Sequence, residues 1–341
     1  MIRFDCDYNE SAHGAILAAI AATAGEQHPG YGTDAHCARA RDLIRAACDA
    51  PEAEVHFLVG GTQTNLTVIA AALRPWEGVI APESGHIAAH ETGAIEAGGH
   101  KVLPLMHENG KLSAAAVAQA VEKARRDPNA EHIVQPALVY ISQPTEYGTL
   151  YSLAELEALS SVCRKAGIPL YLDGARLASA LACPENDASL PDLARLCDAF
   201  YIGGTKCGAL FGEAVVFPRK NTVPHFFTIV KQHGALLAKG RIAGIQFDTL
   251  FTDGLYLKCG QKAIDKAARI RKALRDKGYE LALDAPTNQI FPLLTAAQLA
   301  ALSERVEMSF WENRPDGKTV VRIATSWATT DEDVDRLIEV L

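Results

Sequence analysis

The sequence predicts an α/β protein with a large domain, built on a mostly parallel seven-stranded sheet, and a smaller α+β domain after it. Three observations support this prediction. Seven short apolar runs lie between residues 54 and 218, and helical patterns separate most of them. After residue 220 this alternation gives way to long helical stretches followed by short strands. Strands that alternate with helices indicate βαβ units, and runs that are apolar throughout are typical of strands buried on both faces.

The expected elements of the large domain follow in order. Its strands are Val55–Val59, Gly78–Ala81, Lys101–Leu105, Pro136–Ile141, Ile168–Leu172, Ala199–Ile202 and Ala214–Phe217. Its clearest helical patterns are Gln63–Leu73, Ser113–Arg126 and Ser152–Ala166. The last pattern opens with the spacing of a capping box, Ser152 and Glu155, and stops at Gly167. An earlier apolar stretch, Ala12–Ala24, predicts a helix capped near Asn9 or Ser11.

The last third of the chain predicts the smaller domain. A basic helical stretch over Thr222–Gly260 leads into a long helix from about Gln261 to Lys277. The elements expected after it are short strands near Asn288–Pro292, Val306–Trp311 and Thr319–Ala324 and a closing helix at Asp331–Leu341. We therefore expect a large domain over residues 1–250, with an N-terminal arm at 1–30, and a small domain over residues 251–341.

Composition and charge exclude several classes of protein. Hydrophobic residues make up 48% of the 341 residues and charged residues 22%, which rules out wholesale disorder. The net charge of −8 makes nucleic acid and anionic membranes poor partners. No run of 18 apolar residues predicts a membrane span, and acidic residues precede Ala12 where a signal peptide needs basic ones. Eight cysteines without a CxxC pair indicate reduced thiols and a cytoplasmic location.

A glycine-rich turn follows the first expected strand. Gly60, Gly61 and Thr62 end that strand and open a helical pattern. Glycines allow a tight turn, and free N–H groups at the start of a helix attract a phosphate. A plain strand-to-helix turn is the alternative, and this motif alone favours neither.

A second motif, Tyr171-Leu172-Asp173-Gly174-Ala175-Arg176, ends a buried run. An acid at the carboxyl end of such a strand lies in the crevice where open α/β sheets bind ligands. Arg176 follows closely enough to reach the same ligand as Asp173. A structural ion pair between the two residues is the alternative.

The third motif places Lys206 in a Gly-Gly-Thr-Lys loop after another strand. Apolar neighbours on both sides predict a partly buried ammonium, whose lowered pKa favours Schiff-base chemistry. A surface lysine is the alternative. Taken together, however, the three motifs supply what a pyridoxal phosphate (PLP) enzyme needs: a phosphate-binding turn, an acid for the pyridine nitrogen and a lysine for the aldehyde. We therefore expect PLP as the cofactor.

Five stretches, in this order, carry a resemblance to a known family: GGTQTNL (60–66), SGHIAAHETGA (84–94), YLDGAR (171–176), FYIGGTK (200–206) and VVRIAT (320–325). They resemble the threonine aldolase/aromatic amino acid β-eliminating lyase family of fold-type I, PLP-dependent enzymes, and they cover nearly the whole chain. The resemblance implies an aspartate aminotransferase-like fold whose large domain binds the cofactor.

The resemblance also implies roles for the residues of the motifs. Lys206 resembles the lysine that holds the cofactor covalently, and Asp173 resembles the partner of the pyridine nitrogen. Arg176 resembles the arginine that contacts the ring hydroxyl, while Gly61 and Thr62 resemble the phosphate-binding turn.

Further residues are matched in the same way. His86 resembles a residue that stacks on the cofactor ring and takes part in proton transfer, and Arg322 resembles the arginine that binds the substrate carboxylate. Tyr31 and the basic segment Lys239–Arg241, with Arg241 on a phosphate, resemble groups lent to a neighbouring subunit. A homodimer or homotetramer with shared active sites is therefore expected.

Two histidines on one expected helix suggest a metal pair, His86 and His90, with Glu91 beside them. No third ligand is evident and the order differs from HExxH, so we expect no metal there.

The chain departs from the family pattern in two places. The family has Ser-Asp near its amino end, whereas here Cys6 takes the place of the hydroxyl that contacts the substrate carboxylate. The loop Ser142–Gly148 lacks the histidine that lies near the substrate β-hydroxyl in the family. Either Glu146 or Tyr147 substitutes for it, or Pro144 and Gly148 simply form a turn.

The predicted function is that of a low-specificity L-threonine aldolase, which cleaves the Cα–Cβ bond of a β-hydroxy-α-amino acid to glycine and an aldehyde. A related PLP-dependent β-eliminating lyase or racemase is the alternative. A non-catalytic PLP carrier and a nucleotide-binding module are less favoured, because neither needs Lys206 with Asp173 and Arg176. The expected partner is a small amino-acid substrate, with neither nucleic acid nor membrane involved.

Overall fold

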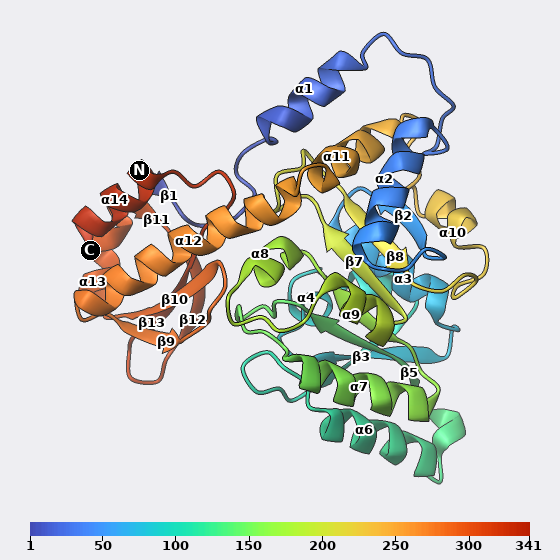
Figure 1. Cartoon of the computed structure of the whole chain (residues 1–341). Helices are drawn as coiled ribbons and strands as arrows, with labels where there is room; N and C mark the ends of the chain where they lie inside the picture. The colour runs from blue at the N-terminus through green and yellow to red at the C-terminus, as the bar shows by residue number, and fades with distance from the viewer.

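The computed structural model describes residues 1–341 and confirms the predicted fold class (Figure 1). The large sheet has seven strands in the order β2-β8-β7-β6-β5-β3-β4; β8 pairs antiparallel with both β2 and β7, and all other pairs are parallel. Their bounds are β2 Glu54–Leu58, β3 Glu77–Pro82, β4 Lys101–Leu105, β5 Gln135–Ser142, β6 Leu170–Asp173, β7 Ala199–Gly203 and β8 Glu213–Phe217.

Helices cover both faces of this sheet, which is why its strands are apolar throughout. Alternate residues of each strand enter separate cores: Val139 and Ile141 pack on one face, Leu138 and Tyr140 on the other. The helices on the Val139 face are α2 Ala35–Ala47, α6 Ala114–Arg126, α7 Leu153–Ala166, α8 Leu177–Ala182, α9 Leu190–Leu196 and α11 Arg241–Phe251. Those on the Tyr140 face are α3 Gly61–Ala72, α4 His86–Ala89, α5 Ala94–Ala97 and α10 Phe226–Gln232. A 3₁₀ turn, Ala130–His132, precedes β5.

Helix ends follow the local sequence, with one correction. Ser152 and Glu155 form the predicted capping box of α7, and Gly167 ends that helix in the left-handed region at φ 65°. The predicted cap near Asn9 or Ser11 is wrong. The first helix, α1, spans Gly14–Ala22, because the side chain of His13 accepts the hydrogen bond from the Ala15 N–H and so takes the N-cap role.

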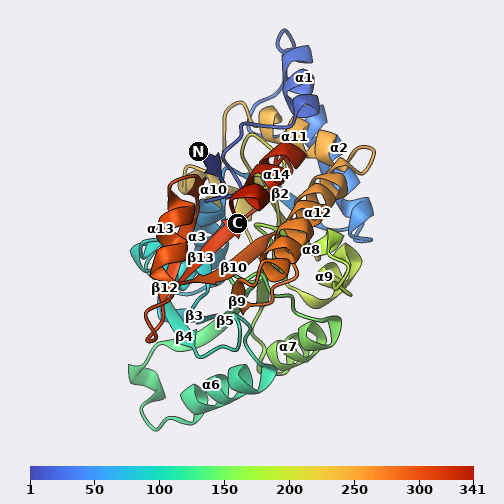
Figure 2. The same ribbon diagram turned by 90° about the vertical axis from the view of Figure 1, so that its left-hand side faces the viewer.

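The C-terminal unit consists of an antiparallel sheet with helices against it (Figure 2). Its strands are β9 Glu280–Leu283, β10 Gln289–Leu294, β12 Ser309–Asn313 and β13 Thr319–Ala324, in the order β12-β13-β10-β9. Its helices are α13 Ala296–Ser303 and α14 Asp331–Val340, and α12 Leu255–Asp276 runs into it from the large unit. The long helix thus begins six residues before its predicted start, and β9 has no counterpart among the predictions.

Residues 2–4, near the amino end, belong to the C-terminal unit. The strand β1, Ile2–Arg3, pairs in parallel with β11, Val306–Glu307, and Ile2 and Phe4 enter the same core as helix α14. A two-residue strand carries too little pattern to be predicted. The boundary at residue 250 remains a prediction, although the first residues of the expected N-terminal arm lie with the smaller unit.

None of the helices combines the length and the apolar composition that crossing a lipid bilayer requires. All eight cysteines are free thiols, and only Cys6 is even partly exposed.

Candidate active site

Two adjoining cavities lie at the carboxyl ends of the parallel strands, where open α/β sheets bind ligands. The inner cavity, about 300 Å³, is lined by Gly60–Thr62, Asp173, Thr205 and Glu213, among others. The outer cavity, about 510 Å³, is lined by Arg176 and by residues of the C-terminal unit such as Trp311 and Arg322. The residues that line both are Tyr8, His86, Glu146 and Lys206. Lys206 therefore lies between the two chambers.

Asp173, at the end of β6, is buried in a network of donors. Its Oδ2 accepts hydrogen bonds from the hydroxyl of Tyr140 at 2.7 Å and from Nδ2 of Asn65 at 3.1 Å. Its Oδ1 accepts from the hydroxyl of Tyr201 and from the N–H of Ala175 at 3.0 Å. These four hydrogen bonds hold the carboxyl group of Asp173 in one orientation at the inner cavity.

The amide of Asn65, on α3, connects this carboxylate to His86. Its Oδ1 accepts from the hydroxyl of Tyr171, and its Nδ2 also donates to Glu91 Oε1 at 2.8 Å. The same Glu91 oxygen lies 2.7 Å from Nδ1 of His86. Burial lowers the pKa of His86, but the hydrogen bond to Glu91 and the negative charges of Glu146 and Asp173 together outweigh it, so the pKa is raised. His86 is thereby oriented and inclined to hold a proton.

Lys206 faces both cavities without an ion pair. Its Nζ lies 5.7 Å from the ring centre of Tyr8, and no carboxylate lies within ion-pair distance. Burial, and then the positive charge of Arg176, lower the pKa of Lys206. An amine that gives up its proton more readily is suited to covalent bonding with an aldehyde.

The loop that carries Lys206 is fastened by Glu213 of β8. Its carboxyl oxygens accept from the N–H of Gly204 at 3.0 Å and from the hydroxyl of Thr205 at 2.8 Å. Burial raises the pKa of Glu213 to about 8, against the effect of these hydrogen bonds. The loop is therefore held from the neighbouring antiparallel strand.

The amino end of α3 forms one wall of the inner cavity. Its N-cap, Gly60, has no side chain to satisfy the first N–H groups of the helix, so these remain available to an anion. A Cβ atom at Gly61 would lie 3.3 Å from the Tyr201 hydroxyl, which is tighter than normal contact. An unpartnered lysine, a fixed carboxylate and an open helix end in one cavity fit the aldehyde, ring nitrogen and phosphate of PLP.

Arg176 is buried, but its partner is not the one the motif suggests. Its Nε and Nη2 lie 2.6 and 3.1 Å from the two oxygens of Asp7, and Asn288 donates a further hydrogen bond to Asp7 at 3.0 Å. The alternative of an Asp173–Arg176 ion pair is therefore wrong, since Asp7 occupies that role. The remaining nitrogen, Nη1, is 4.0 Å from Glu146.

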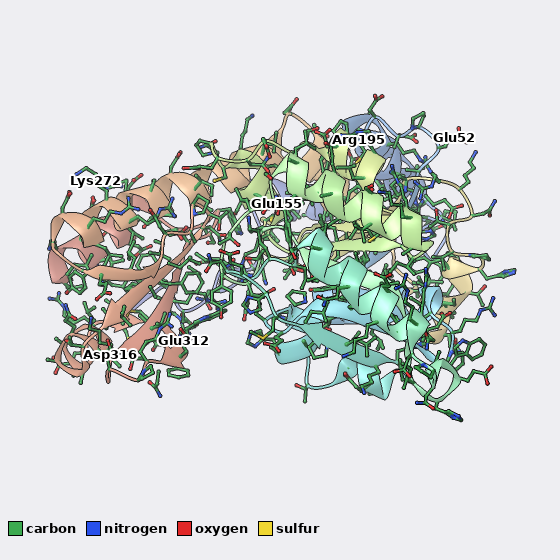
Figure 3. The ribbon with its side chains drawn as sticks, turned by 90° about the horizontal axis from the view of Figure 1, so that it is seen from below. Glu52, Glu155, Arg195, Lys272, Glu312 and Asp316 are labelled. Carbon is green, nitrogen blue, oxygen red and sulfur yellow. The ribbon has the colours of Figure 1, made fainter.

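Arg322, on β13, reaches the outer cavity with donors to spare. Its Nη1 lies 3.3 Å from Gln289 Oε1, its Nη2 lies 3.4 Å from Ser309 Oγ, and its buried Nε has no partner. The guanidinium lies 5.7 Å from the ring centre of Trp311. Glu312 follows Trp311 in β12, and Figure 3 shows it on the side of the C-terminal unit that faces the large unit. An incompletely bonded guanidinium at this position can bind a carboxylate.

Three of the proposed site residues lie outside both cavities. Cys6 directs its thiol to Asn9 Oδ1 at 3.1 Å, and Tyr8 lines the cavities instead. Tyr31 and Arg241 also line neither cavity. Their segments lie together, because the N–H of Tyr31 donates to Ala238 O at 3.1 Å.

Several site residues were not found from the sequence. The tyrosines 140, 171 and 201 sit near the ends of three adjacent strands, and a tyrosine in a fully apolar strand signals a buried hydrogen bond. Asn65 and Glu213 gave no comparable signal. The sequence offers Glu146 only as one of two residues that could replace the histidine missing from its loop. In the structure it is 7% exposed and lines both cavities.

The sequence matches the family model described as beta-eliminating lyase over residues 10–304. The chain belongs to the beta-eliminating lyase family. A low specificity L-threonine aldolase of Pseudomonas aeruginosa is 32% identical to it over 315 residues, which cover 91% of this chain and 87% of the relative.

Solved structures agree with this membership. The threonine aldolase of Leishmania major is 45% identical, with a TM-score of 0.96 over 100% of this chain and 98% of the other. A Thermus thermophilus aspartate aminotransferase mutant shares the fold at 14% identity, with a TM-score of 0.75 over 100% of this chain and 90% of the other. The predicted family, the fold-type I architecture and the expectation of a PLP-dependent carbon–carbon lyase are thus confirmed.

Proposed function

We propose that this chain is a PLP-dependent, low-specificity L-threonine aldolase. The observation that carries the proposal is the position of Lys206, free of any ion pair, between a chamber suited to the cofactor and a chamber that contains Arg322. The names of the relatives support the same activity. The substrate is a β-hydroxy-α-amino acid, and the products are glycine and an aldehyde.

The inner cavity would hold the cofactor. Lys206 would bind it covalently, Asp173 would contact its ring nitrogen, and the turn at Gly61 and Thr62 would bind its phosphate, while Arg176 and His86 would contact the ring. When bound, PLP supplies an electron sink for the negative charge that develops at the substrate Cα. A carboxylate at that position would oppose loss of the proton from the ring nitrogen, and the donors around Asp173 hold its side chain in place.

The outer cavity would orient the substrate. Arg322 binds the α-carboxylate through its free donors, and Tyr8 closes the cavity on the side of the N-terminal segment. The aromatic rings of Tyr147 and Trp311, 5.4 Å apart at their centres, form the wall that the substrate side chain would meet. A wall of rings recognises apolar bulk rather than one particular group, which suits low specificity.

Glu146 is the residue to which we assign the β-hydroxyl proton. Its carboxylate lines both cavities, makes no hydrogen bond and lies 4.0 Å from Arg176. When a base takes that proton, the oxygen lone pair forms the aldehyde carbonyl, the Cα–Cβ bond breaks and its electron pair remains at Cα. His86, whose pKa is raised, is better suited to donate a proton than to accept one.

Tyr31 and Arg241 would serve a neighbouring subunit. They line neither cavity of their own chain, yet their segments lie side by side, and Tyr31 is 43% exposed. This arrangement suits a homodimer or homotetramer in which each site takes groups from its neighbour. A cytoplasmic location, consistent with eight free thiols, remains part of the proposal.

Incubation of the purified protein with L-threonine tests the activity. Equal amounts of glycine and acetaldehyde are expected, whereas 2-oxobutanoate with ammonia would identify a β-eliminating lyase and D-threonine a racemase. Borohydride reduction followed by mass spectrometry should place a pyridoxyl group on Lys206. Lys206→Ala should abolish both the cleavage of threonine and the pyridoxyl adduct. Lys165→Ala, at an exposed position of α7, should change neither the cleavage nor the adduct. An adduct on another lysine would refute the site assignment.

A further inference from the structure

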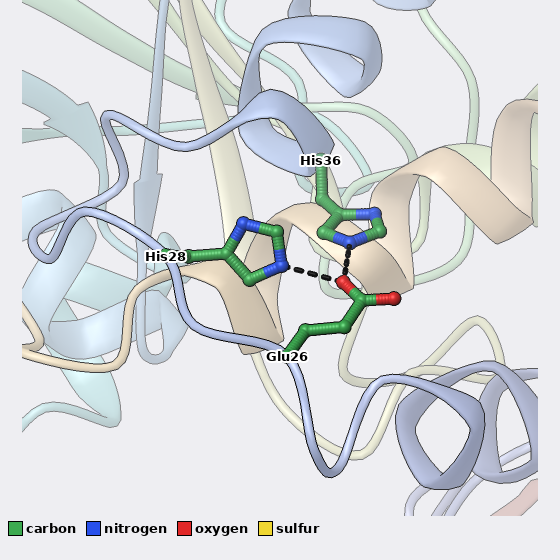
Figure 4. A group of neighbouring side chains, drawn as sticks. All are labelled: Glu26, His28 and His36. Carbon is green, nitrogen blue, oxygen red and sulfur yellow. Dashed lines mark hydrogen bonds and ion pairs between the residues drawn. The ribbon is translucent and has the colours of Figure 1, made fainter.

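A cluster of two histidines and a glutamate lies at the start of α2, outside the candidate active site (Figure 4). Glu26 and His28 belong to the loop that joins α1 to α2, and His36 belongs to the first turn of α2. The Nε2 atoms of His28 and His36 lie 2.5 and 3.1 Å from the same oxygen, Oε2 of Glu26. The ligand atoms of all three side chains lie within 4.8 Å of one another.

The chemistry of the cluster is that of a metal site. Imidazole nitrogens with one carboxylate are a common ligand set for Zn²⁺, which in such sites keeps one position open. The imidazole rings are 5.1 Å apart and nearly perpendicular, with both Nε2 atoms directed at one point.

We propose that Glu26, His28 and His36 form a binding site for a divalent transition-metal ion, with Zn²⁺ the ion that this set favours. In tetrahedral coordination the ligand atoms are about 3.4 Å apart, given metal–nitrogen distances of about 2.0–2.1 Å. The cluster therefore needs shifts of at most about 1.5 Å to close around an ion. Glu26 is exposed and lies in a loop, so such shifts disturb no core packing.

The bound ion would join the loop to the helix. His28 lies three residues before Tyr31, and His36 lies two residues after the N-cap Asp34. The cluster lines neither cavity of its own chain, so the ion takes no direct part in the reaction there. Its effect is to fix the α1–α2 connection, and this inference does not depend on the proposed function.

Zinc titration of the chelator-treated holoenzyme tests the site. Isothermal calorimetry should give one Zn²⁺ per chain, and His28→Ala and His36→Ala should each weaken binding by at least about tenfold. Glu26→Gln keeps the size of the side chain but removes its charge, and it should also weaken binding. His132→Ala, an exposed histidine in the 3₁₀ turn, is the matched control and should bind as the native chain does.

Two further measurements keep the test decisive. Titrations are repeated with Cys6→Ser, which removes the one partly exposed thiol as a zinc ligand. Circular dichroism checks that each variant is folded. Lowering the pH from 7 to 5 should weaken binding to the native chain, because protonated imidazole is no ligand. Absence of zinc binding at millimolar concentration overturns the proposal. So does unchanged affinity in a folded His28→Ala/His36→Ala double variant.

Discussion

The hydroxyl of Tyr140 donates a 2.7 Å hydrogen bond to Oδ2 of Asp173 on the adjacent strand. It is one of four donors around that carboxylate, the others being Tyr201, Asn65 and the N–H of Ala175. The sheet therefore does more than support the active-site loops: its own buried side chains fix the orientation of a site residue.

Asp173→Asn should retain the fold, since the side chains are nearly equal in size, but lose the fixed charge. We expect the rate constant for threonine cleavage to fall by at least about a hundredfold, the effect of losing one preorganised electrostatic group. Tyr140→Phe removes one of the four hydrogen-bond donors to Asp173 and should lower the rate constant much less. Steady-state kinetics with cofactor content checked by absorbance measures both, and near-normal turnover in PLP-loaded Asp173→Asn would refute the role.

Arg322→Lys keeps the positive charge but removes the planar fork of donors. The KM for the amino acid should rise by at least about tenfold, while kcat changes less, because the fork binds the carboxylate before and during the reaction. Lys318→Ala is the control: it removes a positive charge in the turn before β13 that forms an exposed ion pair with Glu280. A fall in kcat at unchanged KM would contradict the assignment.

Glu213→Gln should alter how thermal stability depends on pH. The folded-state pKa of about 8 lies above the ordinary value of 4.5, so the native fold binds the proton more tightly than the unfolded chain does. The stability of the native protein therefore falls as the pH rises from about 4.5 to about 8, and this contribution is absent from the variant. The melting temperature of Glu213→Gln, relative to the native protein, should increase across that range and level off above it.

A mixture of Lys206→Ala and Arg241→Ala chains tests the shared site. After dissociation and reassociation, a mixed dimer contains one site with neither substitution, so activity should partly return. Each variant alone, treated identically, is the control. If mixed oligomers form without any recovery of activity, Arg241 does not serve a neighbouring subunit.

Glu146→Gln tests the proton acceptor in the loop 142–148. Cleavage should slow by about 10²–10⁴-fold, the usual contribution of a general base, while cofactor binding is retained. Tyr147→Phe, at the next position, should have a small effect, because the ring packing against Trp311 is kept. If Glu146→Gln and Tyr147→Phe slow cleavage to a similar extent, Glu146 is not the acceptor of the β-hydroxyl proton.

The elements that the sequence predicts are those that local patterns determine. The seven apolar runs, the Ser152 capping box and the loop of Lys206 all depend on neighbours in the chain, and the structure contains each of them. What the sequence does not predict comes from register and from distant contacts. Arg176 pairs with Asp7, 169 residues away, and Asn65 joins Tyr171 to Glu91 through a helix that packs on the sheet.

The missed helix start has a different cause. Asn9 and Ser11 are better N-cap residues than His13 by residue type. However, Cys6 engages Asn9, and the N–H of His13 donates to Gly208 O, which fixes the backbone there before the helix begins. Tertiary contacts thus override the local preference.

The pairing of β1 with β11 limits how far the two units can separate. Only three residues, Phe4 to Cys6, connect β1 to Asp7, whose buried carboxylate is held by Arg176. An extended chain spans about 3.3–3.6 Å per residue, so the connection has a maximum reach of about 14 Å between Arg3 and Asp7. The N-terminal segment therefore ties the two units together beside the outer cavity, which Tyr8 lines. If the protein releases an aldehyde as proposed, we expect the length of this connection to limit the size of that product, so that lengthening it by one or two residues should extend the substrate range toward bulkier side chains.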